Sequence, residues 1–321
     1  MDKILYHGTF LTMAENRPEP EAVLIRDGVI GGTGTLEEMR KLAPDGMLRD
    51  MEGHTVLPGF IDGHSHLSAV AYQLLVANLK PSPLGPCNCV EDVVRELKGF
   101  LETHSLRPGQ WLMGMGYDNS VFPEGAHPTK EDLDRVSTEI PVAAAHISGH
   151  LCVVNTKGME LLGYTGEHFK VPQGGVVESA GLLKEQAFLG KNGEMQGPAP
   201  EEVVKAVGDA SKLYASYGLT TVHDGKVPEG QYQLLKGAAA MGLLKNDVVM
   251  YLAPELADQL LTGPGPEALA AKGYEHHLRP AGVKLFLDGS PQGKTAWLSE
   301  PYYVVPDGEQ PDYRGFPVQS E

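Results

Sequence analysis

Strand and helix patterns alternate through the last third of the chain. Three apolar strands are predicted, over residues 219–223, 248–252 and 283–288, with helices over 231–241 and 266–272 between them. A longer helix, predicted over 201–217, ends at Gly218, a residue suited to the left-handed conformation that terminates many helices. This alternation is typical of parallel βα units, so the sequence predicts an α/β domain.

The chain before residue 56 has a different pattern. Short strands are predicted over 4–6, 22–26 and 29–30, and Asp27-Gly28 is a good hairpin turn between the last two. Thr35 and Glu38 have the spacing of a capping box for a short helix over 35–42. We therefore expect a small β-rich module over residues 1–55, distinct from the α/β domain over 56–321.

The segment at about 80–205 is predicted to be an insertion within the α/β domain. Apolar residues recur at helical spacing over 90–101, and apolar strands are predicted over 111–116 and 141–147. Both strands lead into polar residues. The stretch 163–181 is rich in glycine and is predicted to be irregular.

Composition narrows the classes of partner. The chain has 26 lysine and arginine residues against 42 aspartate and glutamate residues, a net charge of −16, so we expect no nucleic-acid partner. No secretory signal and no stretch of about 18 apolar residues occurs, which predicts no membrane association. The three cysteines, at 87, 89 and 152, form no disulfide framework and no zinc knuckle, so a cytoplasmic location is predicted.

Residues 55–66 are predicted to be an apolar strand that ends in two histidines. Because side chains two apart share one face of a strand, Asp62, His64 and His66 would point the same way. A divalent cation bound through both imidazoles is one reason for such a pair. Two hydrogen-bonded surface histidines are the alternative, and the spacing alone does not decide between them.

Lys284 lies in the strand predicted over 283–288. Alternation would place it on one face with Phe286 and Asp288, while the opposite, apolar face packs on helices. A lysine in an apolar strand is costly, because desolvation disfavours its charged form. It therefore has either a specific chemical task or a salt bridge with Asp288 or another acid, and the residues leave both open.

Five motifs carry a resemblance to a known family. They are V-L-P-G-F-I-D-G-H-S-H (56–66), G-Y-D (116–118), S-G-H (148–150), G-L-T-T-V-H-D (218–224) and G-V-K-L-F-L-D-G-S (282–290). In this order they resemble the metal-dependent amidohydrolase superfamily, and more narrowly its family 3, the group that includes N-substituted formamide deformylases. The resemblance extends over most of the chain.

The resemblance implies a fold and a chemistry. The fold would be a (β/α)8 TIM-type barrel with a small β-sandwich module and a metal site at the C-terminal mouth of the strands. His64 and His66 match metal ligands of the first strand, and Lys284 matches a fourth-strand lysine that many relatives carboxylate to bridge two metals. One or two divalent ions, with zinc expected, would activate a water that cleaves a non-peptide C–N bond in a small amide, formamide or related substrate. Further residues match positions around the pocket, without an assigned chemical step: Tyr117, Asp118, His150, Asn155, His223 and Asp288.

The sequence also departs from the family pattern. Only four of the eight barrel strands are predicted, so the barrel would be truncated after about the fourth strand. Relatives supply two further histidine ligands and a general-base aspartate from later strands, which would lie beyond Glu321. We therefore expect an N-terminal part of a longer enzyme, with weak or absent metal binding and an unmodified Lys284 in this chain alone. The open sheet edges also predict association, including homo-oligomers. The alternative is a non-catalytic half-barrel that acts as an interaction or regulatory protein.

Overall fold

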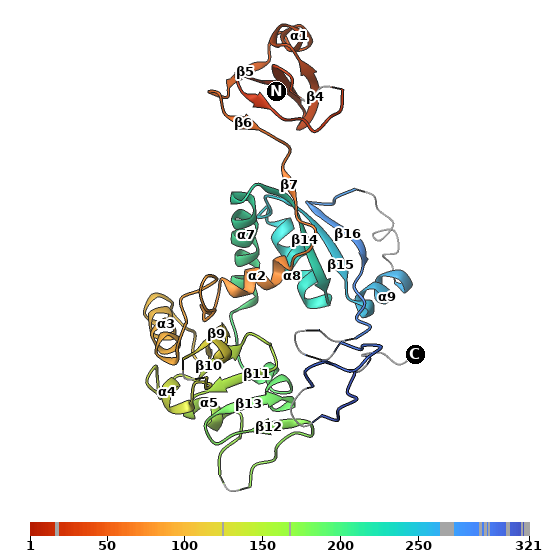
Figure 1. Ribbon diagram of the computed structural model, residues 1–321. Coiled ribbons are helices and arrows are strands. Elements are labelled where there is room, and N and C mark those ends of the chain that lie inside the picture. The colour runs from red at the N-terminus through yellow and green to blue at the C-terminus, as the bar shows by residue number, and fades with distance from the viewer. Residues whose placement is uncertain are drawn as a thin grey trace. The chain divides into compact units, whose positions relative to one another are not determined.

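A computed structural model describes residues 1–16, 19–123, 125–166, 168–263, 273–288, 291, 294, 296–305, 309–315 and 317. Strands and helices are both present, as predicted, and the chain divides into two compact units (Figure 1). One unit is Met1–Asp62 with Gly218–Thr221, and the other is Gly63–Tyr217 with Val222–Glu321.

The first unit is built around a four-stranded sheet in the order β4-β3-β1-β5. Its strands are β1 (Lys3–Tyr6), β3 (Ala22–Arg26), β4 (Val29–Gly34) and β5 (Met47–Asp50). The predicted hairpin turn is confirmed, because Asp27 and Gly28 both have positive φ, 50° and 81°. The helix α1 (Leu36–Leu42) has the predicted capping box of Thr35 and Glu38, and its Met39 packs on Ile4 and Leu24 of the sheet.

The predicted continuous strand over 55–66 is wrong. It is divided into β6 (Thr55–Val56), which pairs with β2 (Thr9–Phe10), and β7 (Phe60–Ile61), which pairs in parallel with β14 (Leu219–Val227). Pro58 between them has no N–H to donate to a ladder. Gly59 lies so close to Thr220 that a Cβ would be 2.2 Å from its Cγ2. The chain therefore changes partner strand between β6 and β7.

A second sheet has the order β16-β15-β14-β7, where β15 is Asp247–Leu252 and β16 is Leu278–Val283. The β7–β14 and β15–β16 pairs are parallel, as the alternating pattern predicted. The accompanying helices are α2 (Leu67–Gln73), α7 (Pro200–Ser216), α8 (Glu229–Ala240) and α9 (Pro254–Thr262). Gly218 after α7 has φ +80°, which confirms it as the helix terminator.

The last strand lies five residues earlier than predicted. The amide of Lys284 donates to Leu252 O (2.9 Å), and β15 ends at Leu252, so the segment leaves the sheet there. The face expected to pack on helices is consequently open: Val283, Leu285 and Leu287 are 43%, 57% and 72% exposed. The helix predicted over 266–272 lies outside the described residues. Helix α9 was not predicted, although Pro254 at its start is a common helix-initiating signal.

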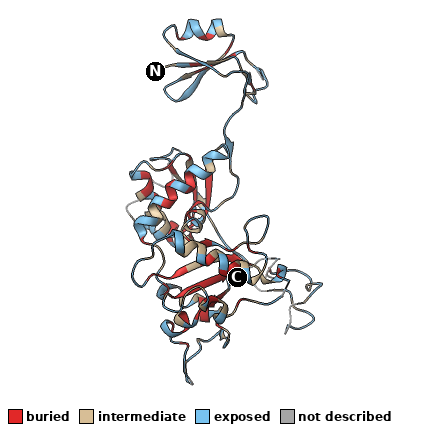
Figure 2. Ribbon diagram, turned by 90° about the vertical axis from the view of Figure 1, so that its left-hand side faces the viewer, coloured by how far each residue is buried: buried red, intermediate tan, exposed pale blue. Residues whose placement is uncertain are grey.

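The inserted segment forms a six-stranded mixed sheet in the order β12-β13-β11-β10-β9-β8. Alternate residues of β10 enter different cores: Ala144 belongs to one buried cluster, and Ala143 and Ala145 to another. Both faces are therefore covered, and the central strands β9, β10 and β11 are mostly buried, as the red strands in the lower part of Figure 2 show. The elements are β8 (Ala77–Asn78), α3 (Val90–Thr103), β9 (Leu112–Tyr117), η1 (Asn119–Val121), α4 (Lys130–Asp134), β10 (Val142–His146), β11 (Leu151–Val154), α5 (Thr156–Leu161), β12 (Gly175–Val177), β13 (Leu182–Glu185), α6 (Gln186–Leu189) and η2 (Asn192–Glu194).

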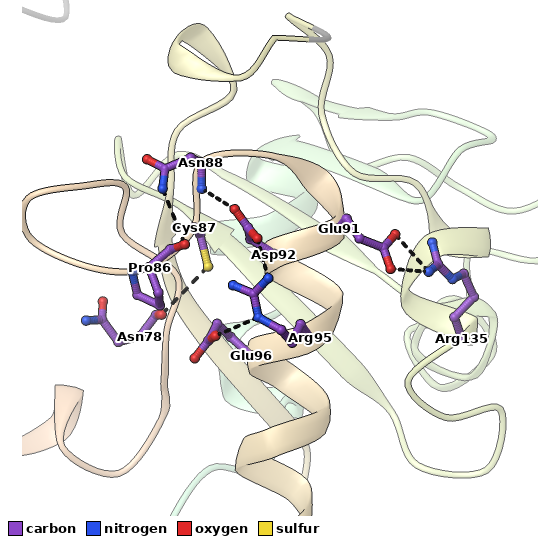
Figure 3. A network of polar contacts seen from close by, with 9 residues as sticks. All are labelled: Asn78, Pro86, Cys87, Asn88, Glu91, Asp92, Arg95, Glu96 and Arg135. Atoms are coloured by element: carbon purple, nitrogen blue, oxygen red, sulfur yellow. Dashed lines mark hydrogen bonds and ion pairs between the residues drawn. The ribbon is translucent and has the colours of Figure 1, made fainter.

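A polar network holds the start of α3 (Figure 3). The amide of Asn88 donates to Asp92 Oδ2 (2.9 Å), and the guanidinium of Arg95 donates to Asp92 Oδ1 (2.5 Å). Arg135, at the end of α4, donates to both carboxylate oxygens of Glu91 at 2.7 and 2.8 Å. These contacts connect two helices of the inserted segment.

Candidate functional site

The two predicted histidine ligands lie side by side just after β7. The rings of His64 and His66 have centroids 5.3 Å apart and are nearly perpendicular. Both rings converge on Gly225: a Cβ built there would be 2.9 Å from Cε1 of His64 and 2.8 Å from Cε1 of His66. The amide of Gly225 donates to Ser65 O (2.8 Å), which fixes the two segments against each other. Convergence therefore comes from a tertiary contact with β14, because neither histidine lies within β7.

His223, a predicted pocket residue, joins this group. Its ring is 5.2 Å from that of His64 and 4.4 Å from that of Tyr251, and the residue is only 5% exposed. The amide of Ser65 donates a long hydrogen bond (3.4 Å) to His223 Nδ1. Because Nδ1 accepts, the neutral ring carries its proton on Nε2. We did not predict Tyr251, since one tyrosine in a strand carries no signal of its own.

Asp224 is a buried carboxylate that sequence reasoning also missed, although it ends the G-L-T-T-V-H-D motif. Its Oδ2 accepts from the amide (3.0 Å) and the hydroxyl (2.5 Å) of Ser68. Its Oδ1 is buried and has no hydrogen-bond partner among the described residues. Burial raises the pKa of the Asp224 carboxyl, and the bonds from Ser68 only partly offset this effect. The carboxyl therefore holds its proton more readily than a surface aspartate.

The two imidazoles at this site suit a divalent ion, but two ligands do not complete a metal site. Two converging imidazoles are common ligands of zinc and similar ions. Within the part of the chain that the structure describes, no group of three or more His, Cys, Asp or Glu residues is arranged to hold a metal. The ammonium of Lys284 lies 5.3 Å from the centre of the Phe286 ring, and that of Lys226 lies 4.6 Å from the same ring. That the Lys284 side chain points toward His64 and His66 remains a prediction.

A methyl group at Gly225 tests the convergence directly. We expect Gly225→Ala to displace the His64 and His66 rings and to lower the free energy of unfolding by about 1–3 kcal/mol, because the new Cβ would overlap both Cε1 atoms. Histidine Hε1 shifts in NMR spectra and urea unfolding would measure the two effects. Gly230→Ala, where a Cβ meets no atom within 4 Å, is the matched control. Unmoved Hε1 signals of His64 and His66 in Gly225→Ala would contradict the geometry.

Tyr117 and Asp118 belong to a second polar group, in the inserted segment, with two histidines that were not predicted. The hydroxyl of Tyr117 is 2.9 Å from Nδ1 of His127, and the Tyr117 and His146 rings have centroids 5.1 Å apart. Tyr117 is fully buried, and burial raises its pKa, so it stays a neutral hydroxyl. Asp118 Oδ1 accepts from the amide (3.0 Å) and the hydroxyl (2.6 Å) of Ser120.

The proton on His146 can be assigned from its hydrogen bonds. The amide of Ser148 donates to His146 Nδ1 (3.1 Å), so a neutral ring carries its proton on Nε2. That Nε2 is buried, lies 4.0 Å from Asp118 Oδ1, and has no hydrogen-bond partner among the described residues. The ring of His127 is 5.8 Å away. Burial and the proximity of the two rings therefore disfavour a positive charge on either histidine.

The burial of His127 and His146 predicts that the stability of the chain depends on pH. Burial lowers the pKa of both His127 and His146 below the ordinary value of 6.5. The folded chain then binds fewer protons than the unfolded chain, so the free energy of unfolding should be level above pH ~7.5 and fall as the pH drops below ~6.5. His146→Asn, which keeps an acceptor near the Nδ1 position, should reduce this fall in urea unfolding measured at steps of pH. The same pH dependence in wild type and variant would contradict the assignment.

The remaining predicted pocket residues make their contacts with residues other than His64 and His66. His150 is exposed, and its Nδ1 is 3.0 Å from a carboxylate oxygen of Glu185. Asp288 Oδ2 accepts from the amide of Trp297 (3.0 Å), and among the described residues no hydrogen bond or ion pair joins this carboxylate to Lys284. Asn155 is fully buried, and protein groups occupy all of its amide positions, so its contacts support a structural role.

Two of the three cysteines are unsuited to act as nucleophiles. All three are free thiols. Cys87 is fully buried and donates to Asn78 O (3.9 Å, Figure 3), and burial raises its pKa to about 12. Burial also raises the pKa of Cys152. Neither of these two thiols ionises readily near neutral pH.

Known proteins are similar to this chain in sequence and in fold. The profile of the amidohydrolase family matches residues 48–319. The chain is 28% identical to the amidohydrolase YtcJ of Bacillus subtilis (strain 168), over 95% of this chain and 57% of that protein. It is 30% identical to the N-substituted formamide deformylase of Arthrobacter pascens, over 75% of this chain and 45% of that protein. The crystal structure of a metal-dependent hydrolase from Pyrococcus horikoshii OT3 superposes with a TM-score of 0.74 at 26% identity, over 99% of this chain and 60% of that one.

This chain spans about half the length of the curated relatives it matches. In the described residues, no helix combines the length and apolar character needed to cross a bilayer. The family match covers most of the chain and includes all four strands of the β16-β15-β14-β7 sheet. The chain therefore belongs to the amidohydrolase family.

Proposed function

We propose that the protein carrying this chain is a metal-dependent hydrolase that cleaves a non-peptide C–N bond in a small amide, formamide or related molecule. The observation that carries the proposal is the convergence of His64 and His66 on Gly225. Family membership supports a hydrolase in general. The name of the Arthrobacter pascens relative makes N-substituted formamides the first substrate class to test.

We propose His64 and His66 as two ligands of one or two divalent ions, with zinc as the first candidate and a carboxylated Lys284 as a further ligand. A divalent ion held there would polarise a carbonyl group and make a nearby water more acidic. His223, whose ring lies beside that of His64, remains a proposed pocket residue. Asp224, held by Ser68, offers a carboxyl group that retains a proton more readily than usual. Tyr117, Asp118, His150, Asn155 and Asp288 remain proposed pocket residues.

The proposed test is metal analysis followed by a hydrolysis screen. The protein carrying this chain should contain zinc or a similar ion and should release amine from N-formyl or N-acyl amines. Treatment with a chelator should remove both the metal and the turnover, and added Zn²⁺ should restore them. If the metal-loaded protein releases no amine from formamides, amides or cyclic imides, the proposal fails.

A second candidate is an interaction protein without catalysis. It is favoured by the exposed Val283, at the end of the edge strand β16, and by the exposed Leu285 and Leu287 that follow it. Such an edge invites association with another chain, including a second copy. Sedimentation analysis would test it, because Leu285→Lys with Leu287→Lys should then convert an assembly to monomers.

The free thiols agree with a proposed location in the reducing cytoplasm.

A further inference from the structure

A cavity of about 200 Å³ lies beside α2, away from the residues that converge on Gly225. Its wall is mostly apolar, formed by Val70, Leu74, Val76, Ala77, Met115 and Leu213. Its polar groups are Gln73, Asn78 and Lys80. A second cavity of about 260 Å³ shares Gln73 and Met115 with it and adds Tyr72, Val203 and Leu234. We call the first the Lys80 cavity.

Lys80 is held at this cavity from several directions. Its amide donates to Asn78 Oδ1 (3.2 Å), and its carbonyl accepts from the amide of Cys87 (3.0 Å). Its aliphatic stem lies against Gly116, where a Cβ would be 2.6 Å from Lys80 Cγ. Gly116 also has φ +101°, a conformation that favours glycine. The Lys80 side chain therefore loses little further conformational entropy when its ammonium binds a ligand.

The ammonium of Lys80 keeps unused donors. It donates to Gln73 Oε1 (2.9 Å), which is a neutral acceptor, whereas an ammonium has three protons to donate. Among the residues with described positions, Gln73 is the hydrogen-bond partner of this ammonium, and it forms no ion pair with a carboxylate. A cation at an apolar cavity favours a ligand that combines a negative charge with an apolar body.

We propose that the Lys80 cavity binds a small organic monoanion, a carboxylate attached to an apolar group. The carboxylate pairs with the ammonium of Lys80 and accepts from the side-chain amide of Asn78 or Gln73. The apolar group lies against Val76, Met115 and Leu213. This binding needs no metal and does not depend on the proposed hydrolase activity.

Calorimetric titration of the metal-free protein tests the proposal, with phenylacetate as the probe and 2-phenylethanol as its neutral counterpart. Phenylacetate should bind saturably, and 2-phenylethanol should bind at least about tenfold more weakly, because a charge-assisted hydrogen bond is lost. Lys80→Met should weaken phenylacetate binding by a similar factor. Lys98→Met, at an exposed position of α3, is the matched control and should leave it unchanged.

Four results would overturn the proposal. They are no saturable binding of phenylacetate, equal binding of 2-phenylethanol, unchanged binding by Lys80→Met, and an equal loss in Lys98→Met. Displacement of phenylacetate by equimolar inorganic phosphate would show a simple anion site and would overturn the role of the apolar wall. If Lys80→Met does not fold, as judged by circular dichroism, the two probes on the wild-type protein still decide the question.

Discussion

Replacing His64 or His66 by alanine should lower the metal affinity of the protein by more than about a hundredfold and should remove its hydrolytic turnover. Changes to residues that only orient a ligand already cost about 10- to 100-fold, so loss of an imidazole ligand should cost more. The two rings converge on one point, so each variant removes one of the two converging imidazoles. Metal content measured by mass spectrometry and release of amine from an N-formyl amine would record both effects.

His168→Ala is the matched control for these two variants. His168 is exposed and lies in the inserted segment, so its loss should change neither metal content nor turnover. Full metal content in both His64→Ala and His66→Ala would show that the pair is a hydrogen-bonded surface group. Loss of metal with turnover retained would separate the metal from the chemistry and would contradict the proposed function.

Replacing Asn155 by alanine should destabilise the chain by about 4 kcal/mol. Its Oδ1 accepts from the amides of Val142 (3.0 Å) and Gly158 (2.8 Å). Its Nδ2 donates to the carbonyls of Ser137 (2.7 Å) and Ile140 (2.9 Å). Because Asn155 is fully buried, alanine would leave these backbone groups without partners and without water. Urea unfolding would measure the change.

Asn155→Asp separates hydrogen bonding from side-chain volume. It keeps the shape and the two acceptor bonds, but it places an oxygen against the carbonyls of Ser137 and Ile140. It should therefore destabilise the chain about as much as alanine does. The exposed Asn88→Ala, at the start of α3, should cost no more than about 1 kcal/mol. A small effect of both Asn155 variants would show that the residue is not structural.

Local structure followed from the sequence wherever neighbouring residues supply the cause. The capping box of Thr35 and Glu38 and the Asp27-Gly28 turn use contacts within a few residues, and both were predicted. Gly218 likewise terminates α7 as expected. The alternation of strands and helices predicted the parallel pairs of the β16-β15-β14-β7 sheet. The ordered motifs identified the family, which the profile match confirms.

The ends of strands were not predictable in the same way. Apolar alternation extends through residues 55–66 and 283–288, yet a strand lasts only as long as its partner does. The chain changes partner between β6 and β7, and β16 ends opposite the last residue of β15. Lys284 consequently lies beyond the strand, where alternation no longer decides the direction of its side chain.

The sequence by itself determined the family, the alternating α/β order and the pair of histidines at 64 and 66. Only the tertiary structure decided that Gly225 of β14 makes room for both rings, that His223 and Asp224 lie beside them, and that backbone groups hydrogen-bond the whole Asn155 amide. It also placed His127 and His146 around Tyr117. The physical reason is distance along the chain: capping and turn bonds connect residues a few positions apart, whereas these contacts join segments up to about 160 residues apart, and no local pattern records them.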